Sequence, residues 1–508
     1  MLSLFILIPV IGAILVSLLP AKLISRQIRS VALVIAIAIL GLTLKLATDF
    51  DLTSSNFQFL EYHAWIPQLG LSYSLGIDGL SLPLMGLNAI LTIIAIASTR
   101  PELERPRLYY SMILFVNAGI AGAFLAQNLL LFVLFYELEL IPLYLLIAIW
   151  GSEKRGYAAT KFLIYTALSG ILILAGFLGI TWLSGSINFD YNAINTESLS
   201  QIKQLILLTV LLIGFGIKIP LVPLHTWLPD AYVESSAPIT ILLGGILAKL
   251  GTYGLIRFGL QLFPEAWGII APGLSIIGVF SVMYGSLTAI AQQDIKRMVA
   301  YSSIGHMGYI IVAAAAGTSI SLIGAIAQMV AHGLILAILF HLVGVVEAKV
   351  GTRDLQILNG LMNPVRGLPL VSALLIMSGM ASAGIPGLVG FVAEFLVFQG
   401  TFPVFPIQSL LCIVASGLTA VYFVILLNRT CFGKLNNDLA YYPKVKFSEQ
   451  APAFVLAFLI IFLGVQPSWL LRWSTPTAKA MVTRVASYPS PASSLNVVKA
   501  PDLAEFEF

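Results

Sequence analysis

The chain alternates long apolar stretches of helical length with short polar connections. About fourteen stretches are long enough to cross a bilayer, because roughly 20 apolar residues in a helix span its hydrocarbon core. Membrane-spanning strands would instead alternate apolar and polar positions, so the pattern favours an all-α polytopic membrane protein over a barrel. The predicted spans cover residues 2–20, 31–48, 80–98, 108–125, 129–150, 158–184, 205–223, 238–262, 267–290, 298–316, 319–346, 367–399, 405–428 and 451–471.

The basic residues predict how these spans are oriented. If the N-terminus lies outside, the inner connections hold seventeen of the 27 Lys and Arg residues, and the segments 49–79 and 185–204 fall outside. The positive-inside rule then places both chain ends on the outer face. Near the N-terminus, Lys22, Arg26 and Arg29 follow the apolar run instead of preceding it, which predicts a retained first span and not a cleaved signal peptide.

Two of the spans are interrupted by proline and glycine. Span seven contains GIKIPLVPLHTWLPD with Pro220 and Pro223, and span twelve contains SAGIPGLVGFVAEF with Pro386. Proline removes a backbone donor and clashes with the preceding turn, so carbonyls freed at bilayer depth need partners from protein or water. Interrupted helices in the two halves of a chain indicate inverted repeats with an ion site between them.

This symmetry predicts the organisation of the chain. We expect helices 1–3 in residues 1–107, a first five-helix repeat (helices 4–8) in 108–262, and a second, inverted repeat (helices 9–13) in 263–428. A last helix and a polar tail occupy 429–508. The Pro/Ser-rich segment 472–508 is too short for both a long lateral helix and another span.

Composition supports the membrane assignment and excludes several kinds of site. The chain is 59% hydrophobic and 10% charged, with mean hydropathy +0.97, whereas soluble domains carry about 25% charged residues. Cys412 and Cys431 form no CxxC pair or cluster ligand set, and the sequence has no Walker loop or glycine-rich dinucleotide motif. We therefore expect no cofactor, metal or nucleic acid bound by this chain, and any associated redox chemistry on another polypeptide.

Ionisable side chains lie inside the predicted spans. A charge at bilayer depth costs roughly 2.5–3.5 kcal/mol on insertion scales, so such residues indicate function. Acids and bases distributed along several spans are the elements of a proton path. The candidate path consists of Glu137, Lys218, Lys249, His306, His332 and Glu394.

Each candidate also has a purely structural interpretation. Glu137 and Glu139 are two residues apart on a helix and point about 200° apart, so one should face the path and the other a neighbouring helix or subunit. Lys218 precedes a helix break, where it could snorkel toward the surface. Lys249 is too deep for that, but could form a permanent salt bridge. The histidines suit relay work near pH 6.5, yet are often satisfied core groups, as His341 could also be.

The sequence contains six characteristic motifs: FYELELIPLYLLIAIWG (135–151), GFGIKIPLVPLHTWLPDAYVESSAP (214–238), GILAKLGTYGLIRF (245–258), QQDIKRMVAYSSIGHMGY (292–309), MVAHGL (329–334) and GIPGLVGFVAEF (384–395). These motifs resemble the antiporter-like membrane subunits of complex I, and most closely subunit 4. The second glutamate of FYELEL, and a glutamate instead of a lysine in span twelve, are similar to the D subunit of the cyanobacterial and plastid type-1 NAD(P)H dehydrogenase. The missing lateral helix separates the chain from subunit 5.

The resemblance implies a role for each residue of the path. Glu137 and Lys218 would form the ion pair of the inner half-channel. Lys249 would form a central relay with His306 and His332, and Glu394 would be the exit acid.

The resemblance also implies the setting of the chain. It would be a subunit of a translocase that couples plastoquinone reduction by NAD(P)H or ferredoxin to proton pumping. The iron–sulfur clusters and the quinone site would lie on other subunits, and the partners would be lipid and neighbouring antiporter-like subunits in a thylakoid membrane. The stretch GIPGLVGFVAEFLVFQG is similar to the variant D subunit of the CO2-uptake complexes.

Two other functions fit the same residues. A subunit of a multi-subunit cation/proton antiporter would share these motifs. A membrane scaffold would keep the charges only as relics.

Overall fold

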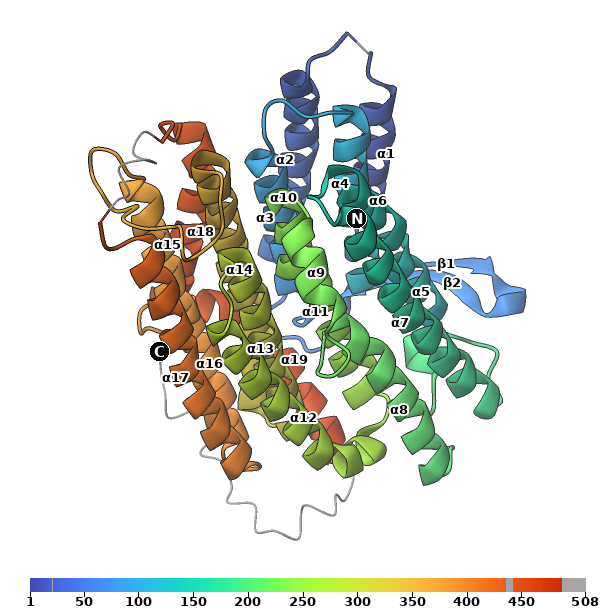
Figure 1. Ribbon diagram of the computed structural model, residues 1–508. Coiled ribbons are helices and arrows are strands. Elements are labelled where there is room, and N and C mark those ends of the chain that lie inside the picture. Colours follow the sequence, from blue (N-terminus) through green and yellow to red (C-terminus); the bar gives the residue numbers. More distant parts are fainter. Residues whose placement is uncertain (21, 435–441, 487–508) are drawn as a thin grey trace.

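The computed structural model of the chain describes residues 1–20, 22–434 and 442–486, which form one bundle of roughly parallel helices with a β-hairpin projecting from its side (Figure 1). The N-terminal part contains α1 (Leu4–Leu18), α2 (Ser25–Asp49), β1 (Gln58–Ile66), β2 (Leu71–Ile77), α3 (Ser81–Ser98), α4 (Pro106–Leu125), α5 (Leu129–Leu138), α6 (Leu140–Trp150), α7 (Arg155–Leu183), α8 (Gln201–Lys218) and α9 (Trp227–Glu234). The remainder contains α10 (Ala237–Leu242), α11 (Ala248–Gly254), α12 (Pro264–Ile290), α13 (Ile295–Ala316), α14 (Ser319–Val350), α15 (Pro369–Ser382), α16 (Val389–Thr401), α17 (Pro406–Thr430), α18 (Phe447–Val465) and α19 (Ser468–Ala486).

The predicted fold class is confirmed. Twelve helical segments in the described residues are long and apolar enough to cross a membrane, with α5–α6 and Ala237–Leu260 each counted once. The shorter apolar helix α1 and the pair α15 and α16 occupy the positions of predicted spans one and twelve. The sequence did not predict the antiparallel β1–β2 hairpin, which joins α2 to α3. The repeat boundaries stay a prediction.

The three most buried helical segments of the bundle carry Lys249, His306 and His332. In the most apolar windows of Ala237–Leu260, α13 and α14, respectively 100%, 94% and 89% of the residues are buried by protein. The corresponding share is 28% in α2 and in α18, whose apolar side chains remain exposed at the surface of the bundle. The charged residues of the core helices are therefore shielded from lipid by other helices.

The two predicted breaks occur at the expected positions. Helix α8 ends at Lys218 and α9 begins at Trp227, while α15 ends at Ser382 and α16 begins at Val389. In the second break Gly384 has φ +70°, a left-handed conformation in which a side chain would be strained.

Two departures from regular α-helix were not predicted. Glu139 separates α5 from α6 within predicted span 129–150, and the cause is Pro142, whose ring clashes with the carbonyl four residues earlier. Around Lys249 the backbone is π-helical over Leu243–Leu247 and Leu255–Leu260. Such π-helical turns are rare and are frequent at functional sites.

One expectation for the C-terminal region is wrong in detail. The segment 472–508 was expected to be a polar tail, but residues up to Ala486 continue α19; the segment 487–508 lies outside the described residues. Helix α19 buries Leu470, Ala478 and Met481, and Thr477 Oγ1 accepts a hydrogen bond of 3.0 Å from the backbone of Gly79.

The connections rich in basic residues cluster at one end of the bundle. Figure 1 shows the C-terminal end of α1 and the start of α2 at the upper end, and the segments around 98–105 and 351–368 at the same end. This arrangement agrees with the orientation that the distribution of charge predicts.

Candidate functional site

The first cluster of buried ionisable groups joins α8 to the kink between α5 and α6. Lys218 Nζ donates a hydrogen bond to Glu139 Oε1, and the side chains of both residues are at most 1% exposed. The same ammonium lies 4.2 Å from the centre of the Tyr136 ring, a cation–π contact. The Tyr136 hydroxyl lies 3.0 Å from Ser169 Oγ, which donates to a carbonyl of α8.

The end of α8 is held in place by its neighbours. Trp227 Nε1 donates a 2.8 Å hydrogen bond to the carbonyl of Ile217, one of the acceptors that a helix C-terminus leaves free. Gly251 of α11 packs so closely that a Cβ there would lie 3.2 Å from Lys218 Cβ. Lys218 and Lys249 therefore lie on adjacent helices, although no hydrogen bond between described atoms joins their amines.

The pairing that the resemblance implied is wrong: Lys218 pairs with Glu139 and not with Glu137. Glu137 is partly exposed beside Gly170 of α7, where a Cβ would lie 1.9 Å from its Oε1. This oxygen has no hydrogen-bond partner among the described residues. The two carboxylates do face different partners, as expected. The kink upstream of Pro142 interrupts the regular helix at Glu139, the carboxylate that pairs with Lys218.

The second cluster begins at Lys249, which is fully buried. Its ammonium donates to the carbonyl of Gly244 at 2.6 Å and lies 2.8 Å from His332 Nδ1. Gly244 belongs to the π-helical stretch, whose irregular pattern makes this carbonyl accessible. No carboxylate of the described residues lies within 4.0 Å of Lys249 Nζ, so the permanent salt bridge considered above is not formed.

His306 and His332 lie against each other in the core. Their rings stack with centres 5.4 Å apart and planes 20° apart. His306 Nδ1 is 2.8 Å from the carbonyl of Ser302. Its Nε2 lies 3.2 Å from the carbonyl of Ser382 and 3.4 Å from Ser382 Oγ. Because carbonyls only accept, each ring nitrogen has an acceptor beside it, and Nε2 is the one that also faces a titratable group. His306 Nε2 lies 3.6 Å from Glu394 Oε1.

Glu394 ends this cluster beside the second helix break. Ser416 Oγ donates a 2.8 Å hydrogen bond to its Oε2. A Cβ at Gly384 would lie 2.8 Å from the same oxygen, so the glycine leaves room for the carboxylate. A cavity of about 10 Å³ lies nearby, lined by Gln328, Ala331, Ile335, Ala381, Ser382, Gly390, Glu394 and the two stacked histidines.

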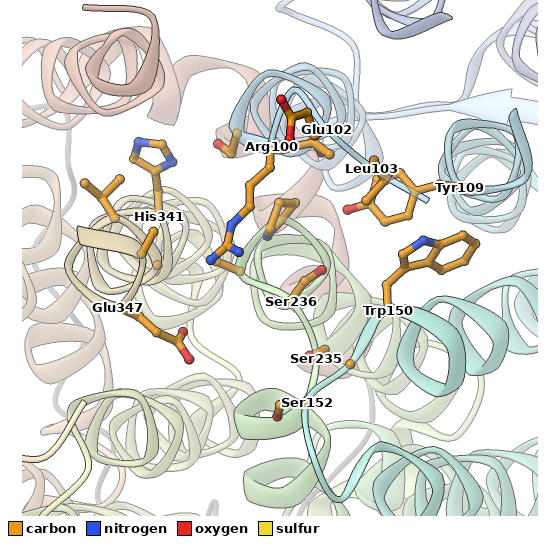
Figure 2. A pocket seen from close by; sticks show the side chains of 18 of the residues that line it. Arg100, Glu102, Leu103, Tyr109, Trp150, Ser152, Ser235, Ser236, His341 and Glu347 are labelled. Carbon is orange, nitrogen blue, oxygen red and sulfur yellow. The ribbon is translucent and has the colours of Figure 1, made fainter. Parts of the chain in front are cut away.

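The structure leaves His341 outside both clusters. Its Nε2 lies 2.8 Å from the carbonyl of Glu449, and the residue lines a second, larger cavity of about 560 Å³. Figure 2 shows the Arg100 side chain extending into this cavity, with His341 and Glu347 on one side and Ser235 and Ser236 on the other. The cavity lies among the connections that the charge distribution places on the inner face.

Lys296 lies at the wall of this inner cavity. The residue is 2% exposed, and its Nζ donates to the carbonyls of Val233 and Ser235 at 3.1 and 2.5 Å. These carbonyls end helix α9, so the lysine caps that helix and interacts favourably with its dipole. Among the described residues, no group of three or more His, Cys, Asp or Glu side chains is placed to hold a metal ion.

Sequence reasoning assigned several contributors too little weight. Glu139 was left out of the candidate path and its role left open, although Pro142 three residues later signals a kink at that point. Gln328 and Ser416 were not considered at all. A single amide or hydroxyl in an apolar helix has no spacing signature, and only the folded arrangement shows what it faces.

The chain belongs to the NADH:quinone oxidoreductase/Mrp antiporter transmembrane family, whose profile matches residues 126–419. More particularly, it is similar to cyanobacterial proteins named NAD(P)H-quinone oxidoreductase chain 4. The protein of that name from Acaryochloris marina is 39% identical over 88% of this chain and 84% of its own length. One from Synechococcus sp., named chain 4 1, is 37% identical over 98% of each chain, and one from Prochlorococcus marinus is 40% identical over 92% and 89%. The predicted resemblance to subunit 4 is confirmed.

Solved structures agree with this assignment. A chain of respiratory complex I from Thermus thermophilus superposes with a TM-score of 0.86 at 26% identity, over 96% of this chain and all of that chain. A chain of the Mrp complex from Dietzia sp. superposes with a TM-score of 0.83 at 22% identity, over 95% and 98%. The Mrp likeness shows a shared fold.

Proposed function

We propose that the chain is a proton-translocating membrane subunit of an NAD(P)H- or ferredoxin-dependent plastoquinone oxidoreductase. Quinone reduction would take place on other subunits, which would hold the iron–sulfur clusters and the quinone site. The chain itself would move protons across a cyanobacterial thylakoid membrane beside neighbouring antiporter-like subunits. The similarity to chain 4 relatives from cyanobacteria supports the complex and the membrane. The stretch 384–400 favours the form that serves CO2 uptake.

One observation carries the proposal: ionisable groups follow one another through the lipid-shielded core of the bundle. Lys249 contacts His332, His332 stacks on His306, and the latter faces Glu394. Each of these groups can bind and release a proton, and each lies within reach of the next or of one bridging water.

The pair of Lys218 and Glu139 would act as the gate of this path. In a buried pair each charge stabilises the other, so separating them changes the free energy of protonation of both. A movement of the α5–α6 kink or of the α8 break would therefore release or bind a proton at Lys218. Glu137, on the other face of the kink, would couple this step to a neighbouring subunit.

The large inner cavity offers a route for protons toward Lys249. Ser235 lines the cavity, and its Oγ lies 3.1 Å from Thr240 Oγ1. The buried Tyr232 hydroxyl donates to the carbonyl of Leu243 at 3.2 Å, and the next carbonyl accepts from Lys249. Hydroxyl groups and carbonyls with these spacings can order a short water chain.

A cation/proton antiporter subunit is the second candidate, favoured by the fold shared with the Mrp complex. The higher identity to chain 4 relatives, 37–40%, argues for the oxidoreductase. Sodium counterflux in vesicles without any dependence on quinone would reverse this preference.

The test uses the intact complex, purified from native membranes and reconstituted in vesicles with an electron donor and plastoquinone. We expect Lys249→Met and Glu394→Gln each to remove this chain's share of the protons pumped per electron, beyond the protons that quinone reduction consumes, because each removes a proton-binding group from the path. Matched substitutions of exposed residues, Lys479→Met and Glu153→Gln, should leave it unchanged. Normal pumping by assembled Lys249→Met and Glu394→Gln complexes would reduce the chain to a scaffold.

A further inference from the structure

We infer that Gln328 holds a single water molecule that passes protons from His332 to His306, which makes this glutamine a positioning residue of the path. The inference rests on the proposed function and adds a residue and a bound water to it. It follows from an interruption in the path, from two unpartnered polar atoms and from the size of the cavity that they share.

The interruption lies between the stacked histidines. His332 Nδ1 is occupied by Lys249 and His306 Nδ1 by the carbonyl of Ser302, which leaves the two Nε2 atoms for proton exchange between the rings. His306 Nε2 also lies 3.2 Å from the carbonyl of Ser382 and 3.4 Å from Ser382 Oγ. The rings stack with their centres 5.4 Å apart, and none of the hydrogen bonds that these two histidines make joins one ring to the other.

Two buried polar atoms mark where the connection runs. His332 Nε2 and Gln328 Oε1 have no hydrogen-bond partner among the described residues, although their side chains are only 3% and 2% exposed. Leaving such atoms unpaired costs the desolvation penalty of each, which a bound water would offset. Both residues line the cavity of about 10 Å³, whereas Lys249, which holds the other nitrogen of His332, does not line it. His332 Nε2 therefore faces the cavity.

The cavity has the size and the polarity of a water site. A buried water needs about 10–15 Å³ and two to four polar partners. Here the partners are Gln328 Oε1, His332 Nε2, and either His306 Nε2 or Glu394 Oε1, which lie 3.6 Å apart. The apolar walls, Ala331, Ile335 and Ala381, leave no room for a second water.

A water at this site passes a proton from one histidine to the other without itself gaining or losing one. His332 takes a proton at Nδ1 from Lys249 and releases one from Nε2 to the water. The water passes a proton to His306 Nε2, which transfers it to Glu394. The Gln328 oxygen accepts one hydrogen of the water throughout and so fixes its orientation between the two rings.

Two substitutions separate this role from packing. Gln328→Met keeps the length of the side chain and removes the oxygen, whereas Gln328→Glu retains an acceptor. In the reconstituted complex we expect Gln328→Met to lower the rate of proton transfer through this chain about tenfold, which corresponds to about 1.4 kcal/mol in activation free energy. We expect Gln328→Glu to stay within twofold of the unchanged protein. The matched control is Ser372→Ala. Ser372 also carries a buried oxygen without a partner among the described residues, but it lies on α15 about three helical turns from the cavity.

A second measurement does not depend on activity. Electron microscopy of the native complex at a resolution that shows water should reveal a peak within about 3.2 Å of Gln328 Oε1 and His332 Nε2. Absence of that peak overturns the inference, whether or not the variants assemble. A peak combined with normal pumping by Gln328→Met also overturns it, because the water is then only structural. Glu394→Gln, measured in parallel, distinguishes failure of this inference from failure of the proposed function. If Glu394→Gln also pumps normally, the proposed function itself fails.

Discussion

The ion pair between Lys218 and Glu139 leads to a prediction that distinguishes the two glutamates of FYELEL. Both partners are fully buried, so Glu139→Gln leaves an uncompensated ammonium at bilayer depth. Breaking a buried pair in this way costs about 3–5 kcal/mol. Glu137 is partly exposed and makes no ion pair among the described residues, so Glu137→Gln should cost less than about 1 kcal/mol.

The magnitude can be checked with a double-mutant cycle. Replacing both members of a buried ion pair by apolar residues is often neutral, since no charge is left behind. Glu139→Leu combined with Lys218→Met should therefore recover most of the stability that Glu139→Leu alone removes. We expect a coupling free energy of at least about 2 kcal/mol between the two positions. Proton pumping should be lost in the double variant even though it is stable.

The assay is thermal dissociation of the purified complex, followed through this subunit. Because unfolding within a large assembly is not two-state, the midpoints serve as a ranking and not as free energies. Glu139→Gln should lower the midpoint by several degrees, on the order of 5 °C, and Glu137→Gln by much less. Equal losses for the two glutamine variants, or a double variant no better than Glu139→Leu alone, would refute the pairing.

Two further predictions compare glycines that differ in their surroundings. Gly384→Ala and Gly387→Ala both place a side chain at positive φ, which costs about 1–2 kcal/mol, but only the first brings a Cβ to 2.8 Å from Glu394 Oε2. Stability should fall similarly in both variants, whereas proton uptake should fall at least threefold only in Gly384→Ala. Equal proton uptake by the two variants would show that the Glu394 carboxylate moves to accommodate the added methyl group. In α7, Gly170→Ala would displace the outer carboxylate of α5, while Gly156→Ala meets nothing within 4 Å. Pumping should therefore fall only in Gly170→Ala, and unchanged rates in both would show that this carboxylate has no role.

The features that depend on local sequence could be predicted. Span number follows from hydropathy, because the bilayer requires a fixed length of apolar helix. The breaks after Lys218 and Ser382 follow from proline and glycine, which act on the neighbouring turn. The placement of ionisable residues on core helices also follows, since lipid disfavours them at the surface.

The features that depend on tertiary geometry could not be predicted. The prediction that Glu137, and not Glu139, pairs with Lys218 assumed a regular helix. The helix is interrupted at Glu139, so that assumption fails at the residue that forms the pair. The contact of Lys249 with His332 joins residues 83 positions apart. Helix α19 was missed because its hydropathy is low and Pro476 lies inside it; packing against α14 and α3 stabilises the helix despite both features.

The small cavity lined by the stacked histidines also bears on which ions the proposed route would conduct. A hydrated alkali cation carries several waters and needs a ring of oxygen ligands to replace them. A space of about 10 Å³ with three or four polar atoms provides neither the volume nor the coordination number. Under the proposed function, protons would hop across it while Na⁺ and K⁺ would be rejected by size. Selectivity of this kind needs no dedicated filter, because the close packing of α13, α14, α15 and α16 around the cavity already provides it.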